Sequence, residues 1–217
     1  MAARPQHRPY RLREIVADGI VHAVALAAAV AGAGALITTA VARGASLAAI
    51  VVYVLSLIAM LAASAAYSLG RFLRFHEVLR RLDHAAILVM IAGTYTPFTA
   101  SVLTGGWAVG LTAAVWTLAA LGVLLKTVLA PHGLRNLTTF LYIAFGWIGV
   151  VAAQPFIAAL SPLVLWLVVA GGAVYTLGTI VYTLERLPYQ RAIWHGFVLA
   201  GAAIHFCAIF LLVAARA

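Results

Sequence analysis

The amino-acid sequence predicts an all-α membrane protein, a bundle of seven transmembrane helices with the N-terminus in the cytoplasm and the C-terminus outside. The composition excludes a soluble domain, because 65% of the 217 residues are hydrophobic and only 9% are charged, against about 25% charged residues in soluble domains. The mean hydropathy of +1.09 agrees. The apolar residues also gather into runs that reach the roughly 20 residues needed to cross a bilayer, and basic residues recur in alternate loops.

Charged or turn-forming residues divide the chain into seven apolar segments. Arg43 and Gly44 end the first segment, and the charged stretch 71–81 follows the second. Glycine and proline mark the later breaks, because both interrupt helices and favour turns. The predicted spans are 19–41, 46–69, 84–103, 106–126, 137–153, 162–183 and 193–214. Residues 1–18 then form a cytoplasmic N-terminal segment, and residues 19–215 form one membrane domain.

The first segment is predicted to be a retained helix and not a cleaved signal peptide. Its apolar run, 19–41, exceeds the roughly 7–15 residues of a signal-peptide core. Glu14 and Asp18 precede it, whereas signal peptides begin with a positively charged region.

Lysine and arginine residues determine the predicted orientation. Twelve of the fourteen lie in the N-terminal tail or in the loops after the second, fourth and sixth segments, and only Arg43 and Arg216 lie on the opposite side. Basic loops remain in the cytoplasm. Six or eight helices would destroy this alternation, so the charge pattern supports seven helices independently of hydropathy.

The net charge of +9 would favour a nucleic-acid partner in a soluble protein. In a membrane protein the same residues anchor cytoplasmic loops at anionic lipid headgroups, and no interleaving of aromatic and basic residues is present. We therefore expect membrane lipids as partners, no nucleic acid, and a multi-pass location in the plasma (inner) membrane. The sequence indicates no oligomeric state.

Three ionisable residues near the start of the first segment indicate a functional role, because placing ionisable groups inside a membrane costs free energy. Glu14, Asp18 and His22 recur every four residues and therefore share one face of a helix. Acids near a helix N-terminus complement the helix dipole, which accounts for Glu14 and Asp18. His22 lies one turn deeper and is not explained in this way.

Further polar residues occur at the cytoplasmic ends of other segments. They are Ser64 and Ser68 in the second segment, Asp83 at the start of the third, and Arg191 and His195 at the last. Singly, each has a structural explanation, such as a serine bonded to its own helix or an aspartate N-cap. Together they lie at one membrane depth, so we expect them to line a cytoplasm-facing polar cavity with the group on the first helix.

Several stretches resemble the hemolysin III family, which belongs to the wider superfamily of adiponectin and progestin receptors (PAQR). The resemblance covers nearly the whole chain from Glu14 onward. It is carried by Arg80-Arg81-Leu82-Asp83-His84, Gly93-Thr94-Tyr95-Thr96-Pro97-Phe98, Leu134-Arg135-Asn136-Leu137 through Gly146-Trp147, and Ile193-Trp194-His195 to His205-Phe206.

The resemblance implies an intramembrane zinc near the cytoplasmic face, held by Ser-x-x-x-His in the second helix, an aspartate opening the third and His-x-x-x-His opening the last. Ser64, Asp83 and His195 match this pattern. Ser68 and Arg191 stand where two histidines are expected. A catalytic zinc usually has three protein ligands, and arginine cannot deprotonate to become one. We therefore expect no intact zinc site and no cofactor.

Two arrangements remain open for these residues. In the first, Asp83 pairs with Arg191, because a buried carboxylate without a partner is strongly destabilising. In the second, His22, Asp83 and His195 form a shifted zinc site, which keeps His195, the one family histidine ligand that this sequence retains.

The resemblance implies a membrane lipid-homeostasis protein or a receptor-like sensor. Its candidate cavity residues are Glu14, Asp18, His22, Ser68 and Arg191. One alternative is a zinc-dependent lipid amide hydrolase, similar to alkaline ceramidases, in which Ser64, Asp83 and His195 are catalytic and zinc activates a water molecule. Another is a pore or transporter with cytolytic activity, although the internal repeat typical of transporters is not visible in the sequence.

Overall fold

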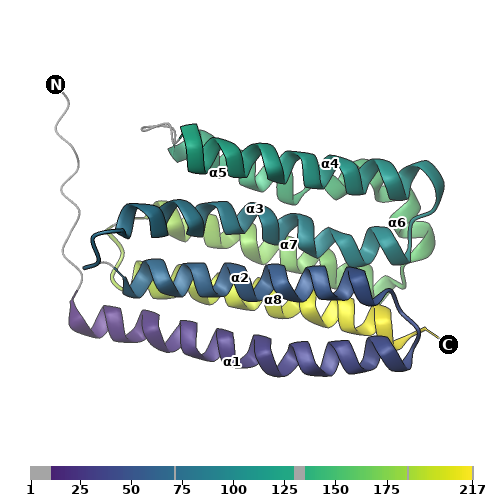
Figure 1. Ribbon diagram of the computed structural model, residues 1–217, viewed down its shortest axis with the longest axis horizontal. Coiled ribbons are helices and arrows are strands. Elements are labelled where there is room, and N and C mark those ends of the chain that lie inside the picture. The colour runs from purple at the N-terminus through teal and green to yellow at the C-terminus, as the bar shows by residue number, and fades with distance from the viewer. Residues whose placement is uncertain (1–10, 71, 130–134, 185, 217) are drawn as a thin grey trace.

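The computed structural model describes residues 11–70, 72–129, 135–184 and 186–216, and all regular structure within these ranges is helical. The α-helices are α1 (Leu12–Ala42), α2 (Leu47–Leu69), α3 (His76–Ser101), α4 (Gly105–Leu124), α5 (Arg135–Gly146), α6 (Ala153–Ala159), α7 (Pro162–Thr183) and α8 (Gln190–Ala214). A π-helix, Leu125–Leu129, extends α4, and a 3-10 helix, Ile148–Ala152, connects α5 to α6. The long helices lie side by side, and α1 begins at one end of the bundle while α8 finishes at the other (Figure 1).

Helices that are distant in sequence pack against one another. α1 contacts both α2 and α8, α8 also contacts α7, and α3 lies between α2 and α4 (Figure 1). Consequently the start of α1, the end of α2 and the starts of α3 and α8 meet at one end of the bundle. The polar residues singled out in the sequence occupy these helix ends.

Six of the described helical segments are long and apolar enough to cross a membrane: 12–42, 47–69, 105–128, 139–159, 162–183 and 190–214. α3, which corresponds to the predicted span 84–103, is not among them, although it has 26 residues. It carries Glu77, Arg80 and Arg81 in its first two turns, and its later part includes further polar residues, among them Thr94 and Thr96. The structure confirms a helical membrane protein with these six helices, while the seventh span and the orientation stay predictions.

α2 and α7 follow the predicted spans 46–69 and 162–183 closely, because local signals mark their starts. The side chain of Ser46 accepts a hydrogen bond from the backbone N–H of Ala49, which caps α2. Ser161 caps α7 in the same way, and proline follows it at the first helical position, where its missing N–H is harmless.

α1 and α8 begin earlier than predicted, at Leu12 instead of 19 and at Gln190 instead of 193. Polar residues in these first turns interrupt the apolar runs, so hydropathy alone does not extend the helices over them. Contacts from distant residues stabilise them as helix. The carboxylate of Glu14 accepts a hydrogen bond from the backbone N–H of Tyr189 (3.1 Å), and the Gln190 amide donates to the carbonyl of Val181 (3.2 Å).

The fifth predicted span, 137–153, is not one continuous helix. α5 ends at Gly146, and the 3-10 helix leads into α6, which continues to Ala159. The hydroxyl of Tyr95 donates to the carbonyl of Gly146 (2.7 Å) and accepts from the N–H of Gly149 (2.9 Å). The break is therefore bonded by a side chain on α3, which no local pattern in the fifth segment could reveal.

Close packing of α7 on α8 yields a stability test at Gly171. A Cβ added there would lie 2.3 Å from Cδ2 of His205, whose ring donates to the carbonyl of Val168 (3.0 Å). We expect Gly171→Ala to lower the unfolding free energy by about 1–3 kcal/mol, the usual cost of overpacking, as measured by unfolding in detergent. Gly34→Ala is the control, because no heavy atom lies within 4 Å of its added Cβ. Equal losses in both variants would contradict this packing.

Candidate functional site

A cavity of about 1000 Å³ lies inside the bundle. Polar side chains line it where the polar helix ends meet, among them His22, Ser64, Asp83, Lys126, Arg191 and His195. Apolar side chains line its remainder, among them Ile91, Phe98, Phe156, Leu160 and Val168. The volume is at the upper end of the range for pockets that bury a small molecule, and the lining changes from polar to apolar along the bundle.

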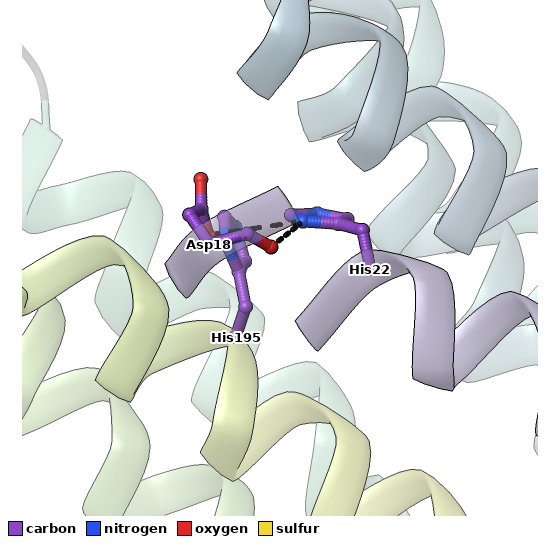
Figure 2. Close-up of side chains that lie close together, drawn as sticks. All are labelled: Asp18, His22 and His195. Carbon is purple, nitrogen blue, oxygen red and sulfur yellow. Dashed lines mark hydrogen bonds and ion pairs between the residues drawn. The ribbon is translucent and has the colours of Figure 1, made fainter. Parts of the chain in front are cut away.

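Asp18 lies at the centre of the polar cluster. Its side chain is 2% exposed, and its Oδ1 lies 2.5 Å from Nδ1 of His195 (Figure 2). Its Oδ2 accepts a hydrogen bond from the hydroxyl of Ser68. The three residues come from α1, α8 and α2, so one buried carboxylate joins three helices. Two donors offset part of the cost of burying its charge.

Two imidazole rings face one serine. The Nε2 atoms of His22 and His195 lie 3.2 Å and 3.3 Å from Oγ of Ser64. Nδ1 of His22 lies 2.8 Å from the carbonyl oxygen of Asp18, and the ring centroids are 4.4 Å apart (Figure 2). A carbonyl only accepts and a carboxylate accepts when ionised, so both rings carry a proton on Nδ1. In the neutral form of either ring, the lone pair of Nε2 then points towards Ser64.

Asp83 and Arg191 occupy the same end of the cavity. The Asp83 carboxylate is 9% exposed and lies within hydrogen-bonding range of Ser64, and the charge of Arg191 attracts it. The Arg191 guanidinium carbon lies 5.0 Å from the centroid of the Tyr67 ring, which is a cation–π contact. A direct ion pair between Asp83 and Arg191 stays a prediction.

Of the residues predicted to share a site, His22, Ser64, Asp83, Arg191 and His195 line the cavity. Asp18 and Ser68 lie behind this lining and bond to each other and to His195. Glu14 accepts backbone hydrogen bonds from Arg11 and Tyr189, so it fastens the start of α1 to the segment before α8.

Further polar and charged residues line the cavity beside the predicted ones, among them Tyr67, His76, Arg80 and Lys126. Tyr67 stacks on His76 with the ring centroids 4.7 Å apart. Tyr67 follows Ser64 by three residues, a spacing that places both on one face of α2 and that could have identified it. Lys126 lies in the π-helix after α4, and no spacing relates it to the other lining residues.

Asp18, His22 and His195 form a cluster that could hold a metal ion, because one ligand atom from each lies within 4.8 Å of the others. The predicted shifted site had Asp83 in the place that Asp18 takes here. The zinc pattern of the hemolysin III family does not fit the residues present. Arg191 brings a fixed positive charge to one ligand position, and Ser68 is bonded to the Asp18 carboxylate.

Comparison with known proteins agrees with the resemblance seen in the motifs. The family model described as Haemolysin-III related matches residues 11–206. The chain is 42% identical over 135 residues to "Hemolysin-3 homolog" of Bacillus subtilis (strain 168), an alignment that covers 62% of this chain and 63% of that protein. It is also 42% identical over 132 residues to "Hemolysin-3" of Bacillus cereus, with 59% of each covered. The chain thus spans less than two thirds of the length of either relative.

The bonds of Asp18 yield a second stability test. In Asp18→Ala, His195 and Ser68 lose their buried acceptor, and unsatisfied buried groups cost about 1–3 kcal/mol each. We expect a clear fall in the thermal unfolding midpoint in detergent. Glu77→Ala is the control, because Glu77 is half exposed and pairs with Arg80 at the surface, where such pairs contribute at most about 1 kcal/mol. A midpoint that falls no further in Asp18→Ala than in this control would refute a central role for Asp18.

Proposed function

The chain belongs to the haemolysin-III-related family of membrane proteins, and from this premise we propose that it is a lipid-homeostasis or sensor protein whose cavity binds an anionic amphiphile from the membrane. The amphiphile has one apolar chain and a carboxylate or phosphate head. In this proposal the polar end of the cavity faces the cytoplasm.

The proposed topology has seven spans with the N-terminus inside. In support, α3 packs between α2 and α4 along the bundle, and α1 and α8 begin and finish at opposite ends (Figure 1). The alternation of basic loops supports the same orientation. A cytoplasmic opening then places the charged end of the cavity at the depth of the inner-leaflet headgroups.

The observation that carries the proposal is the division of one cavity into a charged end and an apolar end. Lys126 and Arg191 line the charged end together with Arg80, which also pairs with Glu77, and Asp83 adds a carboxylate to the lining. Nδ1 of His76, which also lines the cavity, is buried and has no hydrogen-bond partner among the described residues. Fixed cations and an unpaired ring nitrogen favour an oxygen-rich anion, while the apolar end accommodates a hydrocarbon chain.

Binding is tested with Arg191→Gln. Hydrogen bonds to charged groups contribute about 1.5–3 kcal/mol, so we expect the affinity for the anionic amphiphile to fall at least about tenfold. Fluorescence displacement in detergent measures it, with oleate in one arm and lysophosphatidate in the other to separate carboxylate from phosphate. Arg186→Gln is the matched control, since Arg186 is exposed in the segment before α8. Affinities unchanged in Arg191→Gln for both lipids would contradict the proposal.

A second candidate function is a metal-dependent lipid amide hydrolase, which the proximity of Asp18, His22 and His195 favours. If the protein is such a hydrolase, the purified protein should carry one divalent ion per chain, and the substitution His22→Ala should remove that ion. The fixed charge of Arg191 at the same cavity end opposes a divalent cation. We therefore expect elemental analysis to find far less than one ion per chain, and a stoichiometric ion would instead establish the hydrolase candidate.

A further inference from the structure

We propose that Ser64, His195 and Asp18 form a metal-free nucleophilic triad in which Ser64 accepts the acyl group of an ester-linked amphiphile. The proposal rests on the proposed function for one point only, namely that the cavity admits such an amphiphile. It assigns a reaction class, acyl transfer to serine followed by hydrolysis.

The three side chains are connected in the order that such a triad requires. Oγ of Ser64 lies 3.3 Å from Nε2 of His195, and Nδ1 of the same ring lies 2.5 Å from Oδ1 of Asp18. A nucleophile bonded to a base, with the base oriented by a buried acid, defines a triad by geometry whatever the fold. Ser64 and His195 line the cavity, and Asp18 is buried behind them.

The surroundings of Ser64 differ from those of a structural serine in a membrane helix. Such a serine usually bonds the carbonyl four residues earlier. Ser56, two turns earlier on the same helix, does so with the carbonyl of Val52 at 2.7 Å. Ser64 is bonded to His22 and His195, and the Asp83 carboxylate also lies within hydrogen-bonding range of it. Its hydroxyl is therefore positioned between two bases.

The hydrogen-bond geometry favours a triad over a metal centre. Nδ1 of His195 is bonded to Asp18, and Asp18 is bonded again to Ser68. The triad uses both bonds, and the fixed positive charge of Arg191 at the same end of the cavity opposes a divalent cation. His22 remains available as a second imidazole beside Ser64 and donates through Nδ1 to the backbone.

The reaction is balanced by these groups and water. Oγ of Ser64 attacks the ester carbonyl carbon while its proton passes to Nε2 of His195. The ester C–O bond breaks, and the alcohol leaves with that proton. Water then attacks the acyl-serine, gives a proton to His195 and releases the fatty acid, and Ser64 recovers its proton. Asp18 is a positioning residue that stabilises the protonated imidazole. The positively charged side chain of Arg191 lines the same cavity, in which the oxyanion forms.

The test is covalent labelling of the full-length protein in detergent with an alkyl fluorophosphonate, in the presence of EDTA, followed by peptide mass spectrometry. We expect one modified residue, Ser64, and no labelling of Ser64→Ala or of heat-denatured protein. Ser56→Ala is the matched control and retains full labelling. A labelling reaction that EDTA abolishes, or that persists unchanged in Ser64→Ala, overturns the proposal.

Two further variants separate the triad from a merely structural network. Asp18→Asn should slow labelling of Ser64 about a hundredfold or more, since an orienting carboxylate has effects of this size or larger. His195→Ala should lose labelling and recover part of it in added imidazole, which replaces a missing base but not a missing structural bond. Absence of any recovery, with the thermal midpoint of His195→Ala still measurable, refutes the role of His195.

Failure of the triad and failure of the proposed lipid binding can be told apart. If oleate or lysophosphatidate binds in an Arg191-dependent manner while Ser64 is never labelled, the triad fails and the proposed function stands. If Ser64 is labelled while neither lipid binds, the triad stands and the proposed function fails.

Discussion

The buried carboxylate of Asp18 is the constraint on which the polar end of the bundle depends. An ionised group inside a membrane protein must find partners or become prohibitively costly. Asp18 finds them in His195 and Ser68, which belong to two other helices. Because removing one partner of a buried charge costs far more than the bond itself contributes, the relative positions of α1, α2 and α8 are strongly specified at this point.

The shape of the cavity follows from that constraint together with the distribution of small residues. The Asp18 bonds fasten three helices at the polar end, and α3 adds Asp83 and Arg80 to the lining there. Further along the bundle, glycines on α7 and α8 let these helices approach closely, as at Gly171 and Gly201, in the manner usual for membrane helices. The cavity is therefore bounded by the closely packed α7–α8 pair where its lining becomes mostly apolar.

The chain belongs to the haemolysin-III-related family, and two residues at its polar end depart from the zinc pattern that the family resemblance implies. The family pattern places histidines where Ser68 and Arg191 stand, and here both positions have other partners. Ser68 donates to Asp18, and Arg191 lies over Tyr67. A guanidinium group and a divalent cation compete for the same negative charge, and the charge of Arg191 acts on Asp83. Hydrogen bonds among Asp18, His22, Ser64 and His195 occupy this region instead.

The sequence by itself determined the class of the protein and most of its helices, because composition, apolar run length and capping residues act locally. α2 and α7 could be placed to within a residue, and the polar residues could be assigned to one end of the bundle from helix direction alone. Tertiary structure decided which of these residues bond. The carboxylate bonded to Nδ1 of His195 is Asp18, 177 residues away in sequence, whereas Asp83 lies within hydrogen-bonding range of Ser64. No local pattern distinguishes two acids at the same depth, since that choice depends on how α1 packs against α8.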